Sequence, residues 1–106
     1  MKSTILQYFA ENFGLDEVSA LDMYHAYLST LEGYRGKFDE LAEKGDLEAL
    51  RHAFHSVKGC ALNCGDSEIS AAALEGERAA KAGDLAACRL QIPSVVDMMD
   101  KRLTER

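Results

Sequence analysis

The sequence predicts an all-α protein, an up-and-down antiparallel four-helix bundle with a short extra helix at its N-terminus. The 106 residues include one proline and eight glycines, too few turn-forming residues for a fold built of many short strands. Residues of high helix propensity (Ala, Leu, Glu, Lys and Arg) dominate the composition. Apolar residues recur every three or four positions, as they do on the buried face of an amphipathic helix. Together these observations favour helices over strands.

The first two predicted helices lie between recognisable start and stop residues. A short apolar stripe beginning at Ile5 ends at Gly14, because glycine commonly follows the last residue of a helix. Asp16 has the side chain of a helix N-cap and begins the second helix. Apolar positions continue this helix through a glycine-containing middle to the stop at Gly45.

Three further helices are predicted after that stop. The third covers residues about 46–64, the fourth ends at Gly83, and the last contains Pro93 within its apolar pattern. Because proline lacks a backbone N–H, we expect Pro93 to kink or interrupt the last helix. Short connections between helices imply antiparallel neighbours in a single domain, residues 1–106. The candidate N-caps of these helices are Asp46, Asp66 (or Ser67) and Asp84.

The charge balance argues against several classes of protein. With 12 Lys and Arg against 18 Asp and Glu, the net charge is −6. The chain therefore lacks the basic surface that a general nucleic-acid binder or a protein docked on anionic lipid needs. It contains no apolar run of the roughly 20 residues that span a bilayer, and no signal peptide is recognisable at its start. We expect a cytoplasmic protein whose three cysteines are reduced thiols.

The segment from Arg51 to Gly65 contains the candidate functional residues. On a helix each residue advances about 100°, so the apolar residues of the segment form one stripe and His55 lies on the opposite face. His55 is therefore predicted to lie in solvent. The residues predicted on or beside its face are Arg51, His52, Lys58, Gly59 and Leu62.

This arrangement suits a residue that accepts a phosphoryl group. A neutral imidazole offers a nitrogen lone pair as nucleophile near pH 7. Lys58, one turn after His55, can offset the charge of a phosphoryl group on the ring. Gly59, at i+4, leaves room for the ring and an approaching partner. A glycine within a helix costs about 0.5–1 kcal/mol relative to alanine, so a functional reason for its presence is plausible.

The motif His55-Ser56-Val57-Lys58-Gly59, with Gly65 ten positions after the histidine, resembles the H-x-[LV]-K-G-x5-G signature of histidine-containing phosphotransfer (HPt) domains. The resemblance extends from about Asp16 to Leu103. It includes the positions of Gly45-Asp46 before the motif and of Ile69, Glu77, Ala79 and Gly83-Asp84 after it.

The resemblance implies a four-helix bundle whose exposed histidine receives a phosphoryl group from the aspartate of a response-regulator receiver domain and passes it to a second receiver. By position, His55 would be phosphorylated, Lys58 would be its electrostatic neighbour and Gly59 the clearance residue. Family members generally have no kinase activity and bind no nucleotide, and the Mg²⁺ used in transfer belongs to the receiver. The partners would be receiver domains or a hybrid sensor kinase, bound by a monomer. From the helical geometry, Arg51, His52 and Leu62 are candidate docking contacts.

Two residues depart from the usual pattern of the family. Gly76 stands where a leucine is common in the helix after the motif, and Phe54 replaces the alanine that often precedes the histidine. Neither position touches the reacting atoms. Gly76 bears on the packing and register of its own helix.

The sequence also allows three other interpretations. The same face of the bundle could bind receiver or kinase domains without being phosphorylated, or the bundle could have an unrelated function. A zinc site built from His52, His55, Cys60 and Cys64 would need ligands that converge on one point. Because the two cysteines lie about 140–180° around the helix from His55, we expect no metal site and no cofactor. These cysteines, with Cys88, are predicted to be small buried apolar groups.

Overall fold

The computed structural model describes residues 1–106 and consists of five α-helices without strands. This confirms the predicted all-α class. No helix combines the length and apolar character needed to cross a membrane. The helices are α1 (Lys2–Phe13), α2 (Glu17–Lys44), α3 (Leu47–Asn63), α4 (Ser67–Lys81) and α5 (Leu85–Leu103).

Aspartates begin four of the five helices, as predicted. In each, the carboxylate accepts a hydrogen bond from the backbone N–H three residues later, at distances of 2.8 to 3.3 Å. Such a cap satisfies a backbone donor that the helix itself leaves unpaired, and replacing it by alanine typically costs about 1 kcal/mol. The caps of α2 to α5 are Asp16, Asp46, Asp66 and Asp84.

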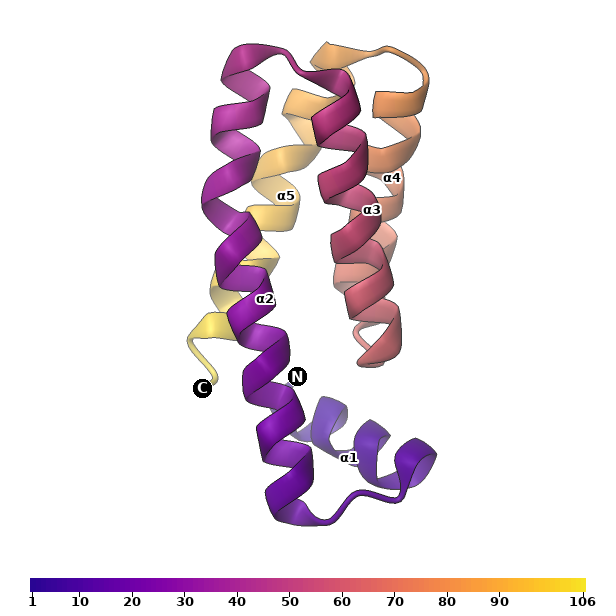
Figure 1. Cartoon of the computed structure of the whole chain (residues 1–106), viewed down its shortest axis with the longest axis vertical. Helices are drawn as coiled ribbons and strands as arrows, with labels where there is room; N and C mark the ends of the chain where they lie inside the picture. Colours follow the sequence, from indigo (N-terminus) through magenta and orange to yellow (C-terminus); the bar gives the residue numbers. More distant parts are fainter.

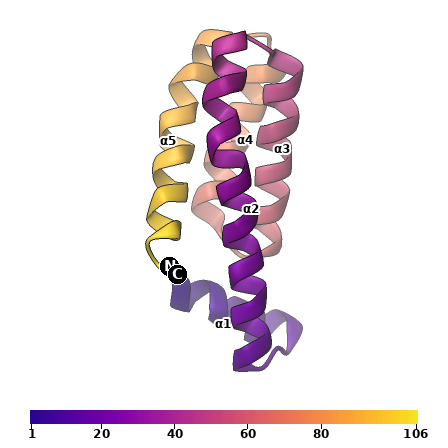
Figure 2. The same ribbon diagram turned by 60° about the vertical axis from the view of Figure 1, so that its left-hand side comes forward.

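Helices α2 to α5 lie side by side, and the molecule measures 43 × 21 × 17 Å (Figures 1 and 2). Helix α3 packs against α2 and α4, and α5 also packs against α2 and α4. Helix α1 lies at the end of this bundle, near the lower part of α2 in Figure 1. The molecule is therefore a helical bundle with one additional helix at its end.

Helix α1 buries Ile5 and Phe9 in the core and also contacts the C-terminal residues and the turn between α3 and α4. Glu105 binds the start of α1, through the ammonium group of Met1 at 3.4 Å and the backbone N–H of Lys2 at 3.1 Å. At the turn between α3 and α4, a Cβ atom built on Gly65 would lie 2.5 Å from the ring of Tyr8 in α1. Gly65 also has a φ of 71°. This turn thus needs glycine both for its backbone conformation and for the approach of α1.

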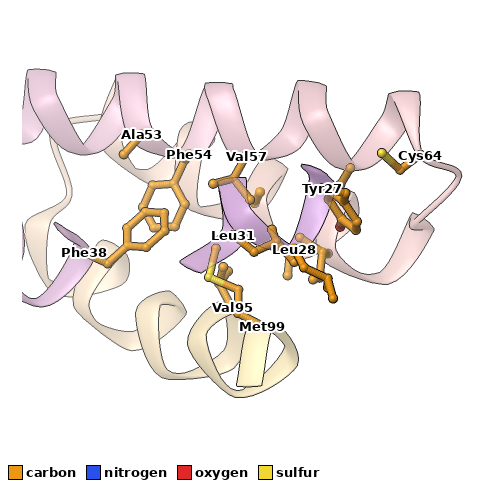
Figure 3. Packing of buried hydrophobic residues seen from close by; sticks show 14 of the residues in the cluster. Tyr27, Leu28, Leu31, Phe38, Ala53, Phe54, Val57, Cys64, Val95 and Met99 are labelled. Carbon is orange, nitrogen blue, oxygen red and sulfur yellow. The ribbon is translucent and has the colours of Figure 1, made fainter. Parts of the chain in front are cut away.

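The apolar stripe predicted in α3 forms one wall of the core (Figure 3). Its buried members are Leu50, Ala53, Phe54, Val57 and Ala61. Each is at most 3% exposed. The ring of Phe54 packs on Phe38 of α2, with their centroids 4.8 Å apart. Burial of this stripe orients α3 and so directs its opposite face to solvent.

The two residues that depart from the family pattern lie against each other. Gly76 is buried in α4, and a Cβ atom built there would lie 2.5 Å from two ring atoms of Phe54. The large side chain on α3 thus occupies the space that a side chain on α4 would take. The departure at one position compensates the departure at the other.

A buried polar cluster joins three helices. The carboxylate of Asp66 accepts hydrogen bonds from Arg102 Nε at 2.9 Å and Nη2 at 3.2 Å, and from the Tyr27 hydroxyl at 2.8 Å. Asp66 is 0% and Arg102 4% exposed. Because both charges are buried, each depends on the other to offset its loss of hydration.

Helix α5 runs without a break from Leu85 to Leu103, so Pro93 does not interrupt it. Pro93 lies on the exposed side of α5, as does Arg89, whose carbonyl would have accepted its N–H, so water can hydrate that carbonyl. Val18 is an apolar residue of α2 that is 70% exposed. The prediction that Cys60 is a buried apolar group was wrong, because it is only partly buried.

Candidate functional site

His55 lies in the middle of α3 on the face away from the core, as predicted. Its side chain is 59% exposed, while its neighbours Phe54 and Val57 are fully buried. The orientation follows from the apolar stripe, because burying one side of α3 leaves the other side in water.

One buried carboxylate holds both His55 and Lys58. Glu77, on α4, is only 3% exposed at its side chain. Its Oε2 atom lies 2.5 Å from Nδ1 of His55, and its Oε1 atom accepts a hydrogen bond from Nζ of Lys58 at 2.7 Å. The glutamate thus links two residues of α3 to the neighbouring helix.

These contacts determine which nitrogen of His55 is free. The hydrogen bond from Lys58 lowers the pKa of Glu77, and the one from His55 lowers it further, against the opposing effect of burial. The carboxylate is therefore ionised at neutral pH and can only accept hydrogen bonds. Nδ1 of His55 must then carry the proton that it donates, which leaves the lone pair on Nε2 directed away from Glu77.

Gly59 has no packing role within the chain. A Cβ atom built on it would meet nothing within 4 Å, and its backbone does not adopt a positive φ. The helix would be more stable by about 0.5–1 kcal/mol with alanine there. The space beside Gly59, one turn after His55, is open to solvent or to a partner.

The cations predicted around His55 are paired with acids. Arg51 donates to Glu48 at 2.6 Å, and Lys58 binds Glu77. The surface around the imidazole is thus less basic than the sequence suggested. His52 is exposed, and Leu62 is 57% exposed on the last turns of α3.

No three His, Cys, Asp or Glu side chains are grouped so that they could hold a metal ion together. Cys60 and Cys64 line a pocket against α2 together with Tyr27. They lie on the side of α3 that is turned away from His55. The fold therefore does not bring the four candidate zinc ligands together: His52, His55, Cys60 and Cys64.

Sequence reasoning missed Glu77 as a site residue, although a signal was present. On α4 the buried residues Ala73, Gly76, Glu77 and Ala80 recur at helical spacing, so a glutamate stands on the stripe that faces the core. A charged residue on such a stripe needs partners, because an unpaired buried carboxylate is costly. Its partners could not be identified from the sequence, since they lie 19 and 22 residues away.

One comparison with known proteins identifies a family. A family model described as the Hpt domain matches residues 22–105, which is most of the chain and includes α3 and α4. Comparisons with curated proteins and with solved structures returned no match.

Proposed function

The chain belongs to the Hpt domain family, and on this premise we propose that it is a phosphorelay intermediate modified at His55. Membership implies a phosphotransfer role in two-component signalling. In the proposed reaction, His55 accepts a phosphoryl group from a receiver-domain aspartate and passes it to another receiver. The observation that carries the proposal is the exposed imidazole, whose Nδ1 is bound to Glu77.

The transfer uses the free nitrogen of the ring. The Nε2 lone pair attacks phosphorus of the aspartyl phosphate, a P–N bond forms, and the P–O bond to the receiver's carboxylate breaks. The positive charge that develops on the ring is offset by Glu77, which accepts the Nδ1–H hydrogen bond. Transfer to the second receiver runs through the same steps in reverse and returns a neutral imidazole. The Mg²⁺ ion used in transfer is expected on the receiver.

Lys58 can serve Glu77 and the phosphoryl group together. An ammonium group has three N–H donors, and one of them is used in the bond to Glu77. The others are available to a phosphoryl oxygen on His55, one turn away. Gly59 leaves clearance for the incoming receiver, and Arg51, His52 and Leu62 form the surface against which the receiver docks.

We infer the remaining properties from the same premise. Short connections join successive helices, and α2 contacts both α3 and α5, which supports the up-and-down antiparallel four-helix arrangement for α2 to α5. The protein is expected to act as a cytoplasmic monomer that binds receiver domains or a hybrid sensor kinase. No kinase activity of its own is expected, because it would receive its phosphoryl group already activated.

The proposal is tested by incubating the chain with phosphorylated receiver domains. We expect an acid-labile, alkali-stable phosphoryl group on the native chain and none on His55→Gln. His25→Gln is the matched control, because it removes an exposed imidazole on α2, outside the proposed docking surface, and should still be phosphorylated. Transfer to His55→Gln would refute the assignment. Receiver binding without transfer to the native chain would instead support a non-phosphorylated interaction module.

A further inference from the structure

Two thiols lie one turn apart on the side of α3 that faces α2. Cys60 and Cys64 both line an open pocket of about 230 Å³, and neither forms a disulfide. The proposed phosphotransfer uses neither residue. The other side chains that line the pocket carry no charge: Met23, Ala26, Tyr27, Thr30 and Asn63.

Only Cys60 among the three cysteines is accessible to a reagent. It is partly exposed, whereas Cys64 is 6% exposed at the end of α3, near Tyr27 (Figure 3). Cys88 is fully buried, and its thiol donates to the carbonyl of Gly76 at 3.8 Å. Cys60 is therefore the more exposed of the two thiols that line the pocket.

The neighbouring thiol also activates Cys60. The adjacent Cys64 thiol lowers the pKa of Cys60 to about 7, and the Thr30 hydroxyl lowers it further, against the opposing effect of burial. The Cys60 thiol and burial both raise the pKa of Cys64. Cys60 is therefore the thiol of this pair that ionises more readily, and the thiolate is the form that reacts with electrophiles. Cys64 remains a thiol beside it.

We propose that Cys60 and Cys64 form a hydroperoxide-reactive dithiol, in which Cys60 is oxidised first and Cys64 then closes a disulfide. The Cys60 thiolate attacks an oxygen of the hydroperoxide, so that an S–O bond forms and the O–O bond breaks. The electron pair leaves on the alkoxide or hydroxide, which is protonated. The Cys64 sulfur then attacks the Cys60 sulfenic acid, an S–S bond replaces the S–O bond, and water leaves. Two thiols lose two electrons and one hydroperoxide gains them.

The backbone at Cys64 allows this closure at some cost. Cys64 is the C-cap of α3, with φ −102° and ψ 2°, and lies outside the regular helix. Cβ atoms four residues apart on a helix lie about 5–6 Å from each other, whereas a disulfide needs about 3.5–4.5 Å. The last turn of α3 must therefore tighten, while Tyr8 packs on the adjacent Gly65. A disulfide closed against such resistance is easily reduced, which makes the modification reversible.

The test uses the full reduced chain and limiting hydrogen peroxide at pH 7, followed by alkylation of the remaining thiols, intact-mass measurement and peptide mapping. We expect a mass decrease equal to two hydrogen atoms, a Cys60–Cys64 linked peptide, and an alkylated Cys88. The native-chain peptide map decides the proposal even where a serine variant folds poorly. Oxidation that reaches Cys88 first, or a Cys60 sulfenic acid that persists in the native chain, would overturn it.

Serine variants separate the two roles. Cys60→Ser should lose about tenfold or more in oxidation rate, because the remaining thiols are buried and protonated. Cys64→Ser should stop at a sulfenic acid on Cys60, which dimedone traps. Cys88→Ser is the matched control and should be oxidised at the native rate. The native rate should rise with pH through an inflection near 7. An unchanged rate in Cys60→Ser would contradict the proposal.

Discussion

The contact between Gly76 and Phe54 makes a quantitative prediction about packing. In Gly76→Ala the new methyl group would lie 2.5 Å from atoms of the Phe54 ring, and that ring is fully buried against Phe38. Overpacking of a core typically costs about 1–3 kcal/mol. The gain in helix propensity from glycine to alanine offsets about 0.5–1 kcal/mol of this. We therefore expect a net loss of about 1–2 kcal/mol in the free energy of unfolding.

Gly76→Ala should change the free energy of unfolding in the opposite direction once the Phe54 ring is absent. Phe54→Ala alone costs about 3–5 kcal/mol, since it leaves a cavity. In that background Gly76→Ala should stabilise the chain by about 0.5–1 kcal/mol, because only the helix-propensity term remains. The double-mutant cycle then gives a coupling energy of about 1.5–3 kcal/mol, within the range found for residues in contact.

Urea unfolding followed by circular dichroism measures all four corners of this cycle. Gly36→Ala is the matched control, because Gly36 is also within a helix but a Cβ atom built on it meets nothing within 4 Å. It should stabilise the chain by about 0.5–1 kcal/mol. The reasoning is refuted if Gly76→Ala stabilises the native chain as Gly36→Ala does, or if the two core substitutions prove additive.

Three further predictions concern the buried acids and the docking surface. Asp66→Asn should lower the free energy of unfolding in urea by about 3–5 kcal/mol, because it removes the buried carboxylate that pairs with Arg102 and leaves that arginine only the exposed Glu68 at 3.5 Å. Glu68→Gln, which alters this exposed partner, should cost less than about 1 kcal/mol, and equal losses would contradict this. The pKa of Glu77 is lowered on folding, so its contribution to stability is present above its unfolded value of 4.5 and is lost as the pH falls through the lower folded value. As the pH falls from 4.5 toward the lower folded value, the free energy of unfolding of the native chain should therefore fall more steeply than that of Glu77→Gln. Parallel curves would show that Glu77 gains nothing from its partners. Leu62→Glu should slow phosphotransfer from a receiver while the far-ultraviolet circular dichroism stays native; lost helicity would place Leu62 in the core, and a native rate would remove it from the docking surface.

The features that could be predicted from the sequence depend on local interactions. An aspartate cap binds a backbone N–H only three residues away, and the buried stripe of α3 repeats within a single helix. Both are visible in a short window of sequence. The same periodicity correctly placed His55 in solvent, because its orientation depends only on which side of α3 is apolar.

The features that were missed depend on packing between helices. The bonds from His55 and Lys58 to Glu77 require α3 and α4 to lie side by side in one register. The pair of Asp66 and Arg102 joins residues 36 positions apart. The local rule for proline also allowed an interruption of α5 that does not occur, since it takes no account of whether the freed carbonyl is exposed. The sequence identified the individual residues, but their partners became visible only in three dimensions.

The bonds of Glu77 to two residues of α3 also bear on how a partner distinguishes the two forms of the protein. Under the proposed function, the imidazole and the ammonium are already bound to Glu77 before any phosphoryl group arrives, so we expect phosphorylation at Nε2 to require no movement of either helix. We expect the phosphorylated and unphosphorylated forms to have nearly the same shape. They would differ by about two negative charges, which the phosphoryl group adds. A receiver would then distinguish the phosphorylated from the unphosphorylated protein by electrostatic potential. Ionic strength would control how quickly each complex dissociates.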